Sequence, residues 1–241
     1  FRMDDKVPLV VPEVNPEDAF KHKGIIANPN CSTIQMVVAL KPIHDNFGIK
    51  RVVVSTYQSV SGWGKQAVDQ LWAEISGISK NKKYREIASE GRVLPSQIAF
   101  NLIPHIDIFL DGGYTKEEMK MANETKKIMR ADIPVTATCV RVPVLISHSE
   151  AVNIELDKDA SVSRVREVLS KAPGIKVLDE LEPGKYPMPL FAEGKDDTFV
   201  GRIRKDYTVK SGIWLWIVSD NLRKGAASNA VQIAELLLSR R

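Results

Sequence analysis

The sequence predicts an α+β domain in which helices cover a mixed or antiparallel sheet. Its strand-like and helix-like segments do not alternate in the regular rhythm of βαβ units, and the strands cluster. No G-x-G-x-x-G turn follows a strand near the N-terminus, so the chain lacks a dinucleotide-binding fingerprint of its own. The 241 residues are 44% hydrophobic and 27% charged, an ordinary globular composition that allows one large core or two smaller ones.

Charge and cysteine content narrow the possible partners. The net charge of +4 fits anionic small ligands as readily as nucleic acid. No block of lysine and arginine marks a nucleic-acid arm, and no apolar run is long enough to span a bilayer, so neither partner is expected. Two cysteines do not make a disulfide framework, which favours a cytoplasmic location. Four scattered histidines and two separated cysteines lack metal-ligand spacing, so no metal is expected.

The first predicted helix begins beside a cysteine. Cys31 stands in the turn Asn28–Thr33, and apolar residues at roughly helical spacing follow over Ser32–Phe47. Asn30 and Ser32 are candidate N-caps. Unpaired N–H groups and the macrodipole at a helix N-terminus favour thiolate over thiol, which indicates a nucleophile. The alternative is a buried, inert cysteine, because free cysteines are among the most buried residues.

Four further segments follow along the chain. Lys50–Gln58 alternates in polarity as a strand does, and Gly64–Ile78 carries an apolar stripe at helical spacing. Lys80–Glu90 is polar and basic, which predicts a surface segment. Gln97–Ile103 has the pattern of a strand, and Pro104 closes it.

The clearest helix pattern covers Thr115–Met129, where Thr115 and Glu118 have the spacing of a capping box. The β-rich stretch Val135–Leu156 follows and is interrupted at Pro143. The remaining predicted elements are a helix at Ser161–Lys171, a short strand at Ile175–Leu178, a hairpin of Thr198–Ile203 with Thr208–Ser219, and a helix from Ala226 to about Arg240.

A nucleophilic cysteine needs a base, and His148 is the best candidate. It lies at the end of the apolar run Arg141–Glu150, where a strand would hold its side chain firmly. A hydrogen-bonded surface histidine is the commoner role for such a residue. The competing histidines stand in a polar loop, near a helix C-terminus and in a loop after a proline, at His22, His44 and His105.

Several polar residues have both a binding and a structural interpretation. Arg141 can form a bidentate pair with a carboxylate ligand, or a structural salt bridge. Glu117 and Lys120 lie on one helix face and could hold an amine and an anionic group, or form an exposed ion pair. Gln58 opens the small-residue segment Ser59–Gly64, which allows a close backbone approach to a ligand or forms a simple turn.

Five separated motifs run along essentially the whole chain: Pro29–Thr33, Tyr57–Gly62, Glu117–Lys120, Arg141 with His148-Ser149, and Asp220–Ala227. In order and approximate spacing they resemble the aspartate-semialdehyde dehydrogenase family, in its Gram-positive-like bacterial branch. The fold that this resemblance implies is the catalytic and dimerisation domain of the glyceraldehyde-phosphate-dehydrogenase-like superfamily. The family reduces L-aspartyl-4-phosphate to L-aspartate 4-semialdehyde with NADPH and releases phosphate. This is an early step towards lysine (through diaminopimelate), threonine, methionine and isoleucine.

The resemblance implies a role for each matching residue. The nucleophile, the acid/base and the group that orients the acyl intermediate would be Cys31, His148 and Gln58. The groups that hold the α-carboxylate, the amino group and the phosphate would be Arg141, Glu117, and the pair Lys120 and Arg2. The NADP site would include Ser61, Gly62 and Asn221. The resemblance also implies a homodimer.

The start of the chain differs from the family pattern. Phe1-Arg2-Met3-Asp4 is neither an initiator methionine nor a signal peptide, and the family's N-terminal nucleotide-binding domain has no counterpart in the sequence. We therefore expect a fragment that is inactive alone. Its parts would be a catalytic and dimerisation domain at 1–218 and a C-terminal helix at 219–241 that would pack on the absent domain.

Two alternatives share features with this interpretation. Another phosphorylating enzyme, such as N-acetyl-glutamyl-phosphate reductase or a glyceraldehyde-phosphate dehydrogenase, uses the same cysteine and histidine chemistry. A non-catalytic dimerisation module or thiol redox sensor would need only the sheet and Cys31.

Overall fold

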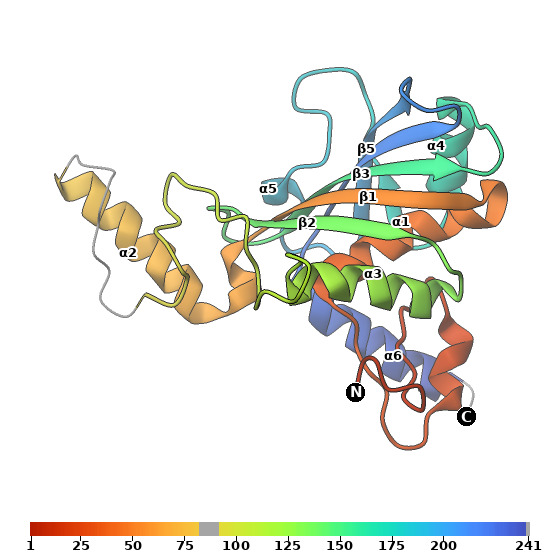
Figure 1. The fold of residues 1–241 in the computed structure, drawn as a ribbon, viewed down its shortest axis with the longest axis horizontal. Coiled ribbons are helices and arrows are strands. Elements are labelled where there is room, and N and C mark those ends of the chain that lie inside the picture. The colour runs from red at the N-terminus through yellow and green to blue at the C-terminus, as the bar shows by residue number, and fades with distance from the viewer. Residues whose placement is uncertain (82–91, 240–241) are drawn as a thin grey trace.

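The architecture is a six-stranded mixed sheet with helices packed across it (Figure 1). The computed structural model describes residues 1–81 and 92–239. The strand order is β2-β1-β3-β6-β5-β4; β1 pairs with β2 and β4 with β5 in parallel, and the other pairs are antiparallel. The strands are β1 (Ile49–Gln58), β2 (Val135–Arg141), β3 (His148–Leu156), β4 (Ile175–Val177), β5 (Thr198–Asp206) and β6 (Gly212–Ser219). The predicted α+β class is therefore confirmed.

Three helices lie side by side over one face of the sheet. The central one, α1 (Cys31–Phe47), packs against four strands and both neighbours, α3 (Lys116–Met129) and α4 (Val162–Lys171). Inward strand residues such as Val52 and Val54 join the helices in the main core. On the opposite face, residues with alternate spacing are half-exposed or exposed, namely Val53, Tyr57, Ala151, Trp214 and Trp216.

Two helix starts follow their sequence patterns. The Asn30 side chain accepts hydrogen bonds from the N–H groups of Ser32 (3.1 Å) and Thr33 (3.2 Å), so Asn30 is the N-cap of α1. At α3, the Thr115 N–H donates to Glu118 Oε2 (2.7 Å) and the Thr115 hydroxyl accepts from the Glu118 N–H (3.4 Å). The predicted capping box is therefore confirmed.

The helix α2 (Lys65–Asn81) extends away from the sheet, with residues 92–103 packed along it in a second, smaller core (Figure 1). The prediction of a strand at Gln97–Ile103 is wrong. Glu74 on α2 accepts hydrogen bonds from the N–H groups of Ile98 (2.9 Å) and Ala99 (2.8 Å). These amides thus have side-chain acceptors and need no neighbouring strand. The surface segment expected at Lys80–Glu90 lies almost wholly outside the described residues.

The C-terminal half forms the predicted helix, short strand and hairpin. The last helix starts later than predicted, because a π-helical turn at Arg223–Ala227 precedes α6 (Ser228–Leu238). Ile233 of α6 is buried against Val10 and Ala19 of the N-terminal segment, so the two ends of the chain pack together. The shortest helix, α5 (Pro189–Ala192), packs on β6. No helix in the described ranges is long and apolar enough to cross a membrane.

Candidate active site

One cavity of about 370 Å³ brings the ten candidate residues together. It lies where the start of α1, the ends of β1 and β2, the start of β3, the first half of α3 and the turn after β6 meet. The candidate residues that line it are Arg2, Cys31, Gln58, Ser61, Gly62, Glu117, Lys120, Arg141, His148 and Asn221. Segments far apart in sequence thus converge as the family resemblance implies, while the role of each residue stays a prediction.

The turn that carries Cys31 is held by carboxylates of α3. The Asn30 N–H donates to Glu124 Oε2 (2.7 Å), and the Asn30 side-chain amide donates to Glu117 Oε1 (2.8 Å). On the other side, a Cβ added to Gly225 would lie 2.9 Å from the Cys31 Cβ. The chain can therefore pass this close to Cys31 only with glycine at position 225.

The environment of Cys31 favours a thiol in the ligand-free site. Burial, followed by the nearby Glu117 carboxylate, raises the pKa of Cys31 to about 12, although Arg141 and the Ser32 N–H act in the opposite direction. The sequence-based expectation of a resting thiolate is therefore wrong. The helix N-terminus is present, but desolvation and a like charge outweigh it. A nucleophilic role for Cys31 then requires that a ligand change these electrostatics.

His148 is fully buried at the start of β3, rather than at the end of a strand as expected. Its Nδ1 accepts the Ser59 N–H (3.0 Å) and lies 3.0 Å from the Ser59 hydroxyl. Burial, and next the Arg141 guanidinium, hold the pKa of His148 well below its usual value, so the imidazole is neutral. Its Nε2 has no hydrogen-bond partner within the described residues.

Arg141 and Gly62 lie next to the His148 imidazole. The Arg141 Nη1 donates to the Ser59 carbonyl oxygen (2.7 Å), and Arg141 forms no ion pair within the described part of the chain. A Cβ added to Gly62 would lie 3.0 Å from Arg141 Nη1 and 3.1 Å from His148 Cε1. The backbone at Gly62 thus lies directly against both groups. The salt-bridge interpretation of Arg141 is not supported, and its buried charge still lacks an anion.

Glu117 is buried and accepts hydrogen bonds from several side chains, so it is not half of an exposed ion pair. Its Oε1 accepts from the Gln58 amide (3.2 Å) and its Oε2 from Lys120 Nζ (3.1 Å). Lys120 also pairs with Asp107 (2.7 Å), and Gln58 donates to the Ser32 hydroxyl (2.5 Å). This network fixes both side chains near Cys31.

Arg2 and Asn221 are the two remaining candidate residues that line the cavity with Ser61. Arg2 Nη1 lies 3.4 Å from Glu124 Oε1, and its side chain stays 41% exposed. The Asn221 Oδ1 accepts from the Ser147 N–H (2.8 Å) and the Ser59 hydroxyl (3.0 Å), and its amide donates to the Ser61 hydroxyl (3.0 Å). Asn221 therefore ties together the loops after β1 and β6 and the one before β3.

Three residues of the site escaped the sequence analysis. Glu124 holds Asn30 and Arg2, and its position seven residues after Glu117 on one helix face could have indicated it. Asp107 lies in a loop, and its polarity alone gives no indication. Ser59 acts through its main-chain N–H, which any residue except proline supplies.

The competing histidines lie outside the cavity. His44 accepts the Ile49 N–H (3.1 Å), His22 accepts the Gly24 N–H (3.0 Å), and His105 stacks on Phe109 at 4.3 Å. Within the described ranges, no group of three or more histidine, cysteine or acidic residues could hold a metal ion.

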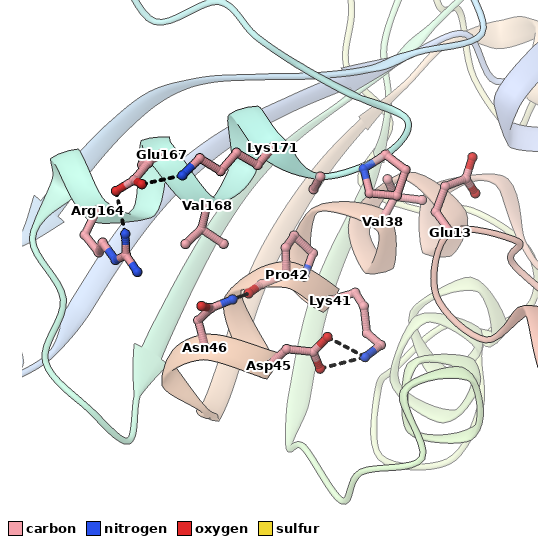
Figure 2. A pocket seen from close by; sticks show the side chains of 12 residues that line it. Glu13, Val38, Lys41, Pro42, Asp45, Asn46, Arg164, Glu167, Val168 and Lys171 are labelled. Carbon is pink, nitrogen blue, oxygen red and sulfur yellow. Dashed lines mark hydrogen bonds and ion pairs between the residues drawn. The ribbon is translucent and has the colours of Figure 1, made fainter.

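A second cavity, between α1 and α4, offers no comparable set of groups. Figure 2 shows most of its charged side chains paired with one another: Lys41 with Asp45 (2.6 Å), and Glu167 with Arg164 (2.6 Å) and Lys171 (2.6 Å). The remaining one, Glu13, forms an ion pair with Lys224 (2.6 Å). These i,i+3 and i,i+4 pairs are helix-surface interactions.

Comparison with known proteins identifies the family. The family model described as "Semialdehyde dehydrogenase, dimerisation domain" matches residues 40–224. Aspartate-semialdehyde dehydrogenases of Aquifex aeolicus and Bacillus subtilis are 58% and 56% identical to the chain, over 99% and 98% of it and 70% of each relative.

Solved structures of aspartate-semialdehyde dehydrogenases also match the fold of the chain. Aspartate semialdehyde dehydrogenase II of Vibrio cholerae, complexed with ASA, superposes with a TM-score of 0.94 at 50% identity, over 99% of this chain and 70% of that one. The Candida albicans enzyme with NADP gives 0.71 at 27% identity, over 98% and 68% of the two chains. The chain therefore belongs to the aspartate-semialdehyde dehydrogenase family, and it spans about 70% of the length of the curated relatives it matches.

Proposed function

We propose that Cys31 accepts the aspartyl group of L-aspartyl-4-phosphate as a thioester, which NADPH reduces to L-aspartate 4-semialdehyde. The observation that carries this proposal is the buried guanidinium of Arg141, which has no ion-pair partner within the described residues, in the cavity of Cys31. A buried charge needs a partner, and a substrate α-carboxylate would supply one. Glu117 lies in the same cavity and can bind the substrate ammonium.

Lys120 and Arg2 suit the phosphate. Both line the cavity, and their side chains are 27% and 41% exposed, so a phosphate bound there can leave towards solvent. Their positive charges would stabilise the negative charge that builds on the leaving group. Gln58, fixed between Ser32 and Glu117, is placed to orient the acyl group.

Substrate binding would itself activate Cys31. After burial, the Glu117 carboxylate is the largest cause of the raised pKa of Cys31. An ammonium group bound to Glu117 would offset that negative charge and lower the pKa of the thiol. The nucleophile would thus become reactive only when the amino-acid substrate is in place.

The cofactor that we propose is NADPH, which supplies a hydride when bound. The residues here fit the reactive end of such a molecule. Gly62 has no side chain and lies beside His148 and Arg141, so a flat ring such as nicotinamide can approach the backbone closely at this position. Ser61 and Asn221 form hydrogen bonds with each other, so they would determine the shape of the cofactor site at Gly62 rather than bind a charged group of the cofactor.

The substrate class is tested by acylation of the chain without cofactor. We expect L-aspartyl-4-phosphate to release one phosphate per chain and to leave an aspartyl group on Cys31, seen by peptide mass spectrometry. N-acetyl-L-glutamyl-5-phosphate and 1,3-bisphosphoglycerate should react far more slowly, because neither carries a free α-ammonium for Glu117. Equal reaction of the three acyl phosphates, or none at Cys31, would contradict the proposal.

We also propose that the chain forms a homodimer through the open face of the sheet. The family model that matches is a dimerisation domain, and the outward residues Tyr57 and Trp216 form an aromatic pair at 5.6 Å. Ala151 lies opposite Trp216 in the register of β3 and β6, near the middle of this face. Aromatic residues are enriched in such interfaces.

Ala151→Arg is expected to convert the dimer to a monomer, because it places a charge in the centre of an apolar interface. Size-exclusion chromatography with light scattering measures the mass directly. Ser170→Arg adds the same charge on exposed α4, away from this face, and should leave the mass unchanged. A dimeric Ala151→Arg variant would place the interface elsewhere.

A further inference from the structure

We propose that Lys127 of α3 is a positioning residue, which fixes the N-terminal segment 1–7 and thereby places Arg2 where it can bind the phosphate of the substrate. The role of Lys127 in holding the segment stands without the proposed function. Its effect on phosphate binding rests on that function, because it requires an acyl phosphate in the cavity of Cys31.

The Lys127 ammonium lies among three main-chain carbonyl groups of this segment. Its Nζ donates to the carbonyl oxygens of Arg2 (2.9 Å), Asp4 (2.7 Å) and Val7 (2.9 Å). An ammonium group has three N–H donors, so these contacts use all of them. Hydrogen bonds from a charged donor are stronger than those between neutral groups. One side chain of α3 therefore holds the segment at three points.

Apolar packing does not fix the first six residues. None of their side chains is buried, and the apolar side chains of Phe1 and Met3 are 80% and 53% exposed. The Asp4 N–H donates to the Phe1 carbonyl oxygen (3.1 Å), and the Val7 N–H donates to the Asp4 carbonyl oxygen (3.0 Å). These two bonds lie within the segment, so they shape it without attaching it to the rest of the fold. The contacts with Lys127 do attach it.

Arg2 extends into the cavity from this segment. Its Nη1 lies 3.4 Å from Glu124 Oε1, which is a long contact, and its side chain is 41% exposed. An ion pair of this kind contributes little to fixing a side chain. The bond from Lys127 to the Arg2 carbonyl oxygen instead fixes the main chain from which the side chain extends. The guanidinium thus stays within reach of the cavity and is available to an anion.

The charged residues of α3 that face the site recur every three or four positions, so they share one face of the helix: Glu117, Lys120, Glu124 and Lys127. Lys120 lines the cavity directly, whereas Lys127 acts on it through Arg2. A single helix therefore sets the positions of both proposed phosphate ligands. Ligands that are held in place before the substrate arrives lower the entropic cost of binding.

Two acyl donors distinguish phosphate binding from general damage to the site. L-Aspartyl-4-phosphate requires the phosphate ligands, whereas the 4-nitrophenyl ester of the L-aspartate side chain gives the same thioester on Cys31 and releases nitrophenol. We expect Lys127→Met to slow acylation by the phosphate about tenfold or more, because binding must then order residues that the wild-type chain already holds. The rate with the ester should stay close to that of the wild type. Equal slowing with both donors, or an unchanged rate with the phosphate, would overturn the proposal.

Lys126→Met controls for the loss of a positive charge. Lys126 is the adjacent residue, is 45% exposed and pairs with Asp132 (2.6 Å), so both acylation rates should stay unchanged. The double variant Arg2→Met/Lys127→Met should react with the phosphate no more slowly than Arg2→Met alone, since Lys127 acts through Arg2. Additive losses would mean that Lys127 acts through another group, which would contradict a positioning role.

Hydrogen exchange followed by mass spectrometry tests the segment without any substrate. The amides of Asp4 and Val7 are hydrogen-bonded in the wild-type chain, so they should exchange more slowly than free amides. Lys127→Met should remove this protection and Lys126→Met should keep it, while protected amides of β1 show that both variants are folded. Unchanged exchange in Lys127→Met would refute the role in holding the segment. Absence of acylation by L-aspartyl-4-phosphate in the wild-type chain would contradict the proposed function instead, and the exchange result would still decide how the segment is held.

Discussion

The Cys31→Ser variant is expected to lose acyl transfer by roughly 10⁴-fold or more. A serine hydroxyl is a weaker nucleophile than a cysteine thiol, and the lowered pKa of the buried His148 makes this imidazole a poor base for a hydroxyl. An oxygen ester would also accept hydride less readily than a thioester. Rapid-quench measurement of phosphate release from L-aspartyl-4-phosphate, with mass spectrometry of the residue-31 peptide, gives the rate.

Cys139→Ala is the matched control. Cys139 is fully buried on β2, where its N–H donates to Glu118 Oε1 (3.0 Å) and its sulfur lies 3.8 Å from the Met121 sulfur. It does not line the cavity. Its replacement should leave acylation at Cys31 intact, with a modest loss of stability. An aspartyl adduct in Cys31→Ser at the wild-type rate would remove Cys31 from the mechanism.

The predictable parts of the fold are those whose physical cause is local. The capping box of Thr115 and Glu118 and the cap at Asn30 each lie within four residues, so the pattern and the structure agree. The segment Gln97–Ile103 has a strand's composition, but its amides find acceptors on α2. That partner is about 25 residues distant in sequence, and composition does not encode it.

The sequence predicts which residues form the candidate site, but it does not predict their pKa values. The five motifs contain nine of the ten candidate residues that line one cavity, and Arg2 precedes all of them; motif spacing alone does not measure a distance. The pKa of Cys31 depends on burial and on Glu117, both set by packing of α3 against α1. The Ser59 N–H has no sequence signature at all. The sequence therefore identifies the side chains of the site, but it does not predict the burial and the neighbouring charges that set their pKa values.

Glu150 is expected to produce the second large effect, on stability rather than on catalysis. It is fully buried on β3, two residues from His148 and on the same face of the sheet. Its carboxylate oxygens accept no hydrogen bond of normal geometry within the described residues, and only the nearby Gln35 amide favours the ionised form. Burial therefore raises the pKa of Glu150 well above its usual value.

The direction of the pH dependence follows from proton counting. Above the pKa of an unfolded glutamate, about 4.3, the folded chain keeps a proton on Glu150 that the unfolded chain releases. The free energy of unfolding then falls as pH rises, by up to about 1.4 kcal/mol per pH unit, until the pKa of the folded state is passed. Glutamine has nearly the same shape and no such proton, so Glu150→Gln should be more stable than wild type at neutral and alkaline pH.

Urea denaturation at several pH values measures this difference. The advantage of Glu150→Gln should be largest near pH 8 and vanish towards about pH 4, where the unfolded glutamate is also protonated. Glu155→Gln is the control, because Glu155 lies on the same strand but on the half-exposed face, 3.9 Å from Arg51. Its stability should follow the wild-type curve. Parallel curves for wild type and Glu150→Gln would mean that Glu150 is ionised in the folded chain. Its negative charge would then act on both Cys31 and the ring of His148, and the neutral imidazole inferred above would require a different explanation.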